Sequence, residues 1–176
     1  MGAKVAGIAN SASRADTAVR VGADAAFLAD DAELQAKLQG CFGETGTDVV
    51  VLTANAWEAF RLSVNIVRRN GRVSILGFPG RAQAQPDFNP LDPSWFYAKQ
   101  LTLLGAGFAP RTDCPPAELR FNVRRNLEYI LELMASQALH LDSLITHRLP
   151  AVRMQEAYEL ASQHSKELVG AVFHWN

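Results

Sequence analysis

Short turns that directly follow apolar runs carry the residue types best suited to binding a ligand. The runs 48–52 and 72–76 are β-branched and apolar, which is typical of buried parallel strands. A third run, 101–104, also ends in small residues. In open α/β sheets, ligands bind at the carboxyl ends of the strands. We therefore expect a binding edge formed by Thr53, Ala54, Asn55, Leu76, Gly77, Phe78, Gly105 and Ala106.

The spacing of cysteine and histidine residues does not support a metal centre. Catalytic zinc takes three protein ligands and leaves one position open. The sequence has no HExxH, CxxC or other clustered spacing among Cys41, Cys114, His140, His147, His164 and His174. No Ser-His-Asp arrangement can be argued from spacing either. The two distant cysteines predict reduced thiols.

The composition is that of an ordinary globular protein. A chain of 176 residues with 48% hydrophobic and 20% charged residues predicts one domain, or one and a fraction. A net charge of -1 gives no field to attract nucleic acid or an acidic membrane surface. No apolar run approaches ~20 residues, and the amino terminus lacks the pattern of a signal peptide. We expect a cytoplasmic protein without nucleic-acid or membrane partners.

Strand and helix patterns alternate through the first half of the chain. Strands are predicted at 4–9, 25–28, 48–52 and 72–76. A helix at 13–21, capped by Ser11 or Ser13 and followed by Gly22, joins the first two. The next helix carries Leu34 and Leu38 on one face, is expected to be capped by Asp30 or Asp31, and ends near Gly40 or Gly43.

The third helix begins near Ala56, keeps its apolar period to Val67, and is expected to end at Asn70-Gly71. The order β-α-β-α-β-α-β predicts a doubly wound, parallel α/β sheet.

The second half is less regular. Residues 81–93 predict a surface loop, 93–99 a short helix with an aromatic face, and 101–104 a strand. The longest helix is predicted at about 117–137, with Arg120, Arg124 and Arg125 on its wet side. Its expected buried stripe consists of Val123, Leu127, Ile130, Leu131 and Met134. A short strand within 142–150, a helix carrying Met154 to Ala161, and a strand at 168–173 complete the chain.

A series of segments, in order, spans nearly the whole chain and resembles one known family. The segments are Gly2–Val5, Arg14, Val21–Asp24, Thr47–Val51, Gly71–Val73, Leu76–Gly80, Lys99–Gly105, Leu144–Pro150, Ala157-Tyr158 and Gly170–Val172. Together they resemble the medium-chain dehydrogenases/reductases, closest to the zinc-type alcohol, threonine or polyol dehydrogenases. The resemblance implies a Rossmann-like domain that binds NAD or NADP.

The sequence also departs from that family. Members carry an amino-terminal catalytic domain with zinc ligands, and this chain shows none of it. The first Rossmann strand and its GxGxxG turn, which holds the pyrophosphate at a helix N-terminus, are absent as well. We therefore expect residues 1–140 to form a partial dinucleotide-binding domain. Residues 141–176 correspond to a segment that in the family packs on the catalytic domain.

The residues that follow the first strand of this chain, predicted at 4–9, bear on whether the cofactor is NAD or NADP. A carboxylate at this place binds the ribose 2′-hydroxyl and favours NAD. This chain instead has Ala9, Asn10 and Ser11, with Arg14 one helical turn later. These side chains could donate hydrogen bonds to a 2′-phosphate, which favours NADP. The alternative is that Ser11 only caps the helix and Arg14 only faces solvent.

By resemblance, the strand-end turns at 53–55, 76–78 and 105–106 would line the nicotinamide half of the cleft. The alternative is that their glycines serve the turns alone. The strand 101–104 pairs in the family with its copy in a second subunit, so we expect a homodimer through this edge.

Two other kinds of residue have alternative roles. His147 is expected to be structural, and the alternative is that it binds a metal ion. Five arginines are expected to form solvated helix faces, and the alternative is a phosphate-binding patch; they are Arg68, Arg69, Arg120, Arg124 and Arg125.

Two functions remain open from the sequence. The first is the cofactor-binding portion of an NAD(P)-dependent oxidoreductase that moves hydride between the cofactor and an alcohol/carbonyl pair. In that case zinc is expected only in the missing domain, and this chain is inactive by itself. The alternative is a non-catalytic, truncated Rossmann module that acts in binding or oligomerisation.

Overall fold

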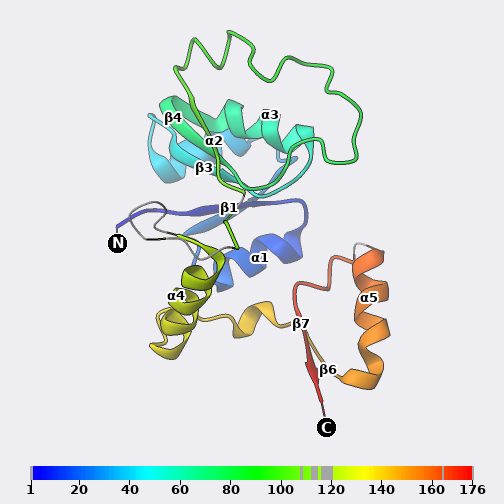
Figure 1. Cartoon of the computed structure of the whole chain (residues 1–176). Coiled ribbons are helices and arrows are strands. Elements are labelled where there is room, and N and C mark those ends of the chain that lie inside the picture. The colour runs from blue at the N-terminus through cyan, green and yellow to red at the C-terminus, as the bar shows by residue number, and fades with distance from the viewer. Residues whose placement is uncertain (1, 108, 112–114, 116–120, 164, 176) are drawn as a thin grey trace. The chain divides into compact units, whose positions relative to one another are not determined.

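The computed structural model describes residues 2–107, 109–111, 115, 121–163 and 165–175 (Figure 1). The chain divides into two compact units, Met1–Asp31 with Leu127–Asn176, and Ala32–Asn126. Every strand pair in the described residues is parallel. The protein therefore has the predicted α/β, Rossmann-like fold, with its described strands hydrogen-bonded in three ladders, β1-β2, β3-β4-β5 and β6-β7.

The first unit begins with a βαβ arrangement of β1 (Ala6–Ala9), α1 (Ala12–Arg20) and β2 (Ala25–Leu28). Ala6 pairs with Ala25, and the register continues to the ends of both strands. A Cβ atom at Gly7 would lie 2.6 Å from the Cβ atom of Ala18, so glycine allows the helix to pack closely on the strand. Gly22, with φ of 110°, follows the helix as predicted.

The carboxyl-terminal part of this unit is a second parallel ladder. It contains η1 (Asp142–Leu144), β6 (His147–Pro150), η2 (Ala151–Arg153), α5 (Met154–Ser162) and β7 (Ala171–His174). The Thr146 hydroxyl donates to the Gly170 carbonyl at 3.1 Å and accepts from the Val169 N–H, also at 3.1 Å. This side chain therefore joins the starts of both strands.

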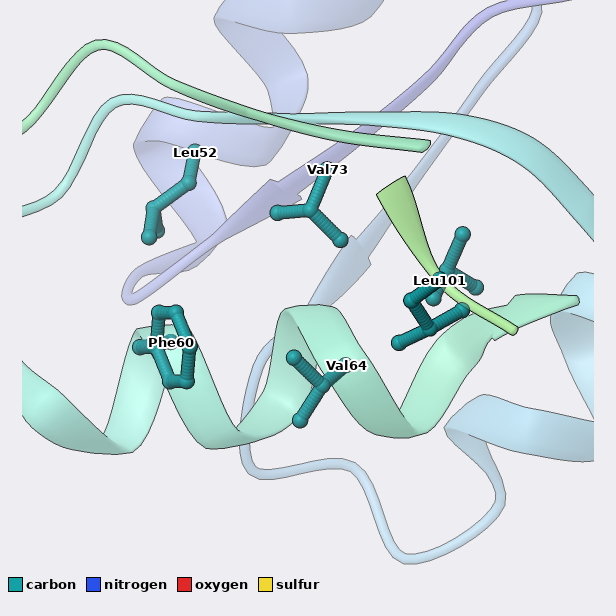
Figure 2. Close-up of a cluster of buried hydrophobic side chains, with 6 residues drawn as sticks. Leu52, Phe60, Val64, Val73 and Leu101 are labelled. Atoms are coloured by element: carbon teal, nitrogen blue, oxygen red, sulfur yellow. The ribbon is translucent and has the colours of Figure 1, made fainter. Parts of the chain in front are cut away.

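The second unit contains α2 (Leu34–Phe42), β3 (Thr47–Leu52), α3 (Trp57–Ile66), β4 (Val67–Ile75) and β5 (Thr102–Gly105). The strand order is β3-β4-β5. Figure 2 shows the core that forms where one face of this sheet meets α3. Its buried members are Leu52, Phe60, Val64, Val67, Val73 and Leu101.

The boundary between α3 and β4 differs from the prediction. The helix ends at Ile66, and Val67 is already the first residue of the strand. Thr47 pairs with Val67, but Val49 pairs with Arg72, so β4 bulges between these two pairs. Asn70, with φ of 58°, makes the predicted left-handed turn within this bulge instead of at a helix end. Val67 fits the apolar period of α3 because it is buried in the same core as that helix, although it belongs to β4.

Two other local predictions are wrong. Residues 93–99 form successive turns and not a helix, because the Ala98 N–H donates to the Pro93 oxygen five residues earlier, so the i→i−4 bonding of an α-helix is not kept. The Asp92 carboxylate accepts the Ser94 N–H at 2.8 Å. The hydrogen bonds of the Asp92 carboxylate also hold its pKa below the ordinary value. The N-cap of α2 is Glu33, and neither Asp30 nor Asp31 occupies that position.

Lys99 closes the carboxyl end of α3. Its Nζ atom donates to the main-chain oxygens of Val64 at 2.9 Å, Asn65 at 2.7 Å and Val67 at 3.0 Å. These carbonyls have no partner inside a helix that ends at Ile66, so the ammonium group takes the place of the missing turn. Half-burial lowers the pKa of the Lys99 side chain.

The helix α4 (Val123–Ala135) shows an unexpected face. The stripe that the sequence predicts to be buried is exposed, with Leu127 at 56% and Leu131 at 62%. Arg125, predicted to face water, is half-buried. The apolar period is therefore present, but no described residue covers it. None of the helices in the described ranges is long and apolar enough to cross a membrane.

Candidate functional site

The carboxyl ends of three neighbouring strands meet in the second unit. We call the turns 53–55, 76–78 and 105–106 the strand-end platform. The ends are joined by main-chain bonds, because the N–H groups of Leu76 and Gly77 donate to the Leu52 oxygen, each at 2.9 Å. The Ala106 N–H donates to the Ile75 oxygen at 2.9 Å. The structure thus brings together the eight residues that the sequence assigns to this edge.

Glycine allows the chain segments of the platform to approach closely. A Cβ atom at Gly77 would lie 2.5 Å from the Ala54 oxygen and 2.6 Å from the Thr53 oxygen. One at Gly107 would lie 2.7 Å from the Leu76 oxygen. No side chain fits at those distances, so these glycines set the spacing of the strand ends.

A side chain of the same unit fastens the turn that follows β4. Asn55 accepts the Phe78 N–H through Oδ1 at 2.9 Å and the Gly80 N–H through its main-chain oxygen at 2.6 Å. Gly80 has φ of 74° and lies against the Trp57 indole. The sequence suggested Asn55 only as a residue of the edge. Its position directly after a strand, facing a glycine-rich turn, was the available signal for this second role.

The hydrogen bonding of the platform limits what it can offer to a ligand. All three N–H groups of the turn 76–78 already donate within the unit. Leu76 and Phe78 are nevertheless 47% and 67% exposed. A ligand that docks on this turn therefore meets exposed apolar side chains and main-chain acceptors, and it must bring its own hydrogen-bond donors.

The other predicted site residues lie at the start of α1, in the first unit. Ser11 is the N-cap in extended conformation, as one alternative predicted, but its side chain makes no capping bond. Its Oγ atom is buried and has no partner in the described residues. The Arg14 guanidinium donates to Asn10 Oδ1 over a long 3.4 Å, and the Ala9 oxygen accepts the Ala29 N–H at 2.8 Å.

Arg14 also borders a shallow groove in the same unit. The groove has a volume of about 340 Å³ and is otherwise lined by Thr17, Ala18, Val21, Leu144, Leu168 and Val169. The Thr17 hydroxyl is already hydrogen-bonded within α1, because it donates to the Ser13 oxygen at 2.8 Å and accepts from Arg20 at 2.7 Å. Arg14 therefore supplies the charge at this groove.

The described residues do not fit a metal ion. No group of three His, Cys, Asp or Glu side chains lies close enough together in these ranges to hold one. His147 Nδ1 lies 2.9 Å from the Thr146 hydroxyl, and Cys41 is a free thiol. Cys114, His164 and Arg120 lie outside the described residues. Arg68 pairs with Asp48 at 2.6 Å.

The family model and the curated relative that match this chain are both dehydrogenases. The family model described as zinc-binding dehydrogenase matches residues 1–122. The L-galactonate-5-dehydrogenase of Escherichia coli is 27% identical over 141 residues, which cover 80% of this chain and 36% of that protein.

Solved structures share the fold. An alcohol dehydrogenase from Thermotoga maritima superposes with a TM-score of 0.75 at 21% identity, over 99% of this chain and 44% of that one. The L-idonate 5-dehydrogenase of Escherichia coli gives a TM-score of 0.70 at 17% identity, over 97% and 42%. The chain thus spans less than half the length of these relatives.

Proposed function

The chain belongs to the zinc-binding dehydrogenase family, and on this premise we propose that it is the cofactor-binding portion of an NAD(P)-dependent oxidoreductase of the alcohol dehydrogenase type. The strand-end platform carries this proposal. It lies at the carboxyl edge of a parallel sheet, where α/β folds bind nucleotides. When bound, the nicotinamide ring supplies the hydride chemistry that interconverts an alcohol and a carbonyl compound.

The platform suits the nicotinamide half of a dinucleotide. A carboxamide group brings an NH₂ donor, and the turn 76–78 has its own N–H groups satisfied while its exposed side chains are apolar. Thr53, Ala54, Asn55, Leu76, Gly77, Phe78, Gly105 and Ala106 would hold this half. Their work is to orient the ring and to keep water from one of its faces.

Ala9, Asn10, Ser11 and Arg14 would hold the adenosine ribose. The buried Ser11 hydroxyl, which lacks a partner in the described residues, and the weakly bonded Arg14 guanidinium are donors that suit a phosphate. No carboxylate stands at the end of β1 to repel it. We therefore favour NADP over NAD.

Zinc chemistry must come from elsewhere. The described residues contain no three ligands that could hold the ion. The catalytic ligands, and the choice of alcohol, would be supplied by a part of the protein that the longer relatives have and this chain does not span. We expect this chain to be inactive by itself and to act in the cytoplasm.

The alternative function is a non-catalytic module for binding or oligomerisation. Two observations favour it: β5 is a terminal strand of its ladder, and the apolar face of α4 is exposed. Pairing of β5 with its copy would form a homodimer through residues 101–104. Light scattering at high protein concentration tests this arrangement, and a monomer would rule it out.

Titration of the purified chain with NADPH and NADH, followed by cofactor fluorescence, tests the proposed function. We expect saturable binding with preference for NADPH. No saturation up to millimolar cofactor would refute a cofactor role for this chain and leave the non-catalytic alternative. Equal affinity for both cofactors would refute the proposed ribose contacts alone.

A further inference from the structure

Asn55 makes two different hydrogen bonds to the same turn. Its side-chain oxygen accepts from Phe78, and its main-chain oxygen accepts from Gly80, so one residue at the end of β3 fastens two points of the turn after β4. Gly77 directly precedes Phe78 and packs against the Thr53 and Ala54 oxygens. The turn is thereby held against the neighbouring strand end along its length.

The Phe78 bond is not required to satisfy a buried group. Phe78 is 67% exposed and Asn55 is exposed too, so water could replace the amide oxygen at little cost in stability. The bond does favour one conformation of the turn, because the Phe78 N–H meets the Asn55 side chain, which follows β3, only when the turn after β4 lies against it. Its effect should therefore appear in ligand binding more than in folding.

We propose that Asn55 is a positioning residue, whose side-chain oxygen holds the turn 76–80 in the conformation that receives the nicotinamide half of the cofactor. This inference rests on the proposed function and goes beyond a simple cofactor contact. A ligand binds more weakly in proportion to the loss of the competent conformation. If the turn is competent about a tenth of the time without the bond, the apparent Kd rises about tenfold.

Asn55→Leu, a change of similar size that removes the acceptor, tests the role. Two measurements are needed: hydrogen exchange of the Phe78 amide, read by NMR in the free protein, and the NADPH Kd. Asn55→Asp keeps the acceptor and should retain Phe78 protection. At high salt, which screens the new charge, it should also bind NADPH nearly as well as the wild type.

Asn89→Leu is the matched control. Asn89 is also exposed, and its Oδ1 atom accepts the Leu91 N–H at 3.0 Å, in a loop outside the platform. We expect Asn55→Leu to speed Phe78 exchange and weaken NADPH binding about tenfold, with little change in the unfolding midpoint. Asn89→Leu should change none of the three quantities.

Several outcomes would overturn the inference. Unchanged Phe78 exchange in Asn55→Leu would show that the bond does not order the turn. Faster exchange with a Kd within about twofold of wild type would show that this order does not matter for binding. An equal loss in Asn89→Leu would remove the specificity of the effect. If the wild type does not bind NADPH at all, the proposed function fails and this role fails with it.

Discussion

Replacing Lys99 with methionine should destabilise the unit Ala32–Asn126. Methionine keeps the unbranched stem but removes the ammonium group, which donates to the oxygens of Val64, Asn65 and Val67. A hydrogen bond from a charged donor contributes about 1.5–3 kcal/mol. The three bonds share one half-buried group whose pKa is lowered by desolvation, so their contributions do not add in full. We expect a net loss of about 2–3 kcal/mol.

Urea unfolding followed by tryptophan fluorescence measures this loss. Trp57 and Trp95 both lie in the affected unit, so a Trp175→Phe background confines the signal to it. Because the chain has two compact units, the transition of this unit is fitted by itself. For a unit of this size the expected change corresponds to roughly 8–24 °C in Tm.

A matched pair of variants separates this capping role from a general effect of charge. Lys37 is exposed and lies in the same unit, where it makes a surface ion pair with Glu33, so Lys37→Met should shift the transition by less than about 0.5 kcal/mol. Lys99→Arg keeps the charge, but its planar group cannot repeat the contact with three carbonyls, so an intermediate loss is expected. A change below about 0.5 kcal/mol in Lys99→Met would refute the reasoning, because the surface control alone could give it.

Three further predictions concern the strand-end platform, the start of α1 and the dependence of stability on pH in the acid range. Gly77→Ala should cost about 2–3 kcal/mol in urea unfolding, because its Cβ atom would lie 2.5 Å from a main-chain oxygen. Gly40→Ala, in α2 with open space around it, should instead stabilise by about 0.5–1 kcal/mol, and equal effects of the two would contradict this account. Arg14→Ala should weaken NADPH binding about tenfold and leave NADH binding unchanged in parallel titrations, whereas an equal loss for both would argue against a 2′-phosphate contact. The hydrogen bond from Arg153 lowers the pKa of Glu156, so its contribution is present at neutral pH and disappears as the pH falls through that lowered pKa. Glu156→Gln should therefore reduce the dependence of Tm on pH in the acid range, and an unchanged dependence would show that this exposed pair contributes nothing.

The sequence predicted the elements whose signals are local. The helix at 12–20 has a serine cap and a glycine stop, and the strand 25–28 is a short apolar run between turn residues. Both were placed within a residue or two. The parallel α/β order and the family resemblance followed from the same alternation, repeated along the chain.

The predictions failed, or were incomplete, where the role of a residue depends on contacts with residues distant in the sequence. Val67 fits a helical period, and only its pairing with Thr47 makes it a strand residue. The stripe of α4 has a clear period, but a period does not specify what covers it. Asn55 was assigned to the right edge, but its bond to Phe78 joins residues 23 positions apart, and no local pattern carries that information.

The bulge of β4 fastens the three strands of the second unit together at one end of the sheet. Between the two flanking pairs, β3 advances two residues, from Thr47 to Val49, and β4 advances five, from Val67 to Arg72. The difference of three residues is extra chain at the amino-terminal ends of the strands. The Asn70 N–H donates to the Lys99 oxygen at 2.7 Å, and Arg68 pairs with Asp48 on β3 at 2.6 Å. The extra residues therefore connect β4 both to β3 and to the segment that leads into β5, so deleting them should loosen the amino-terminal ends of all three strands.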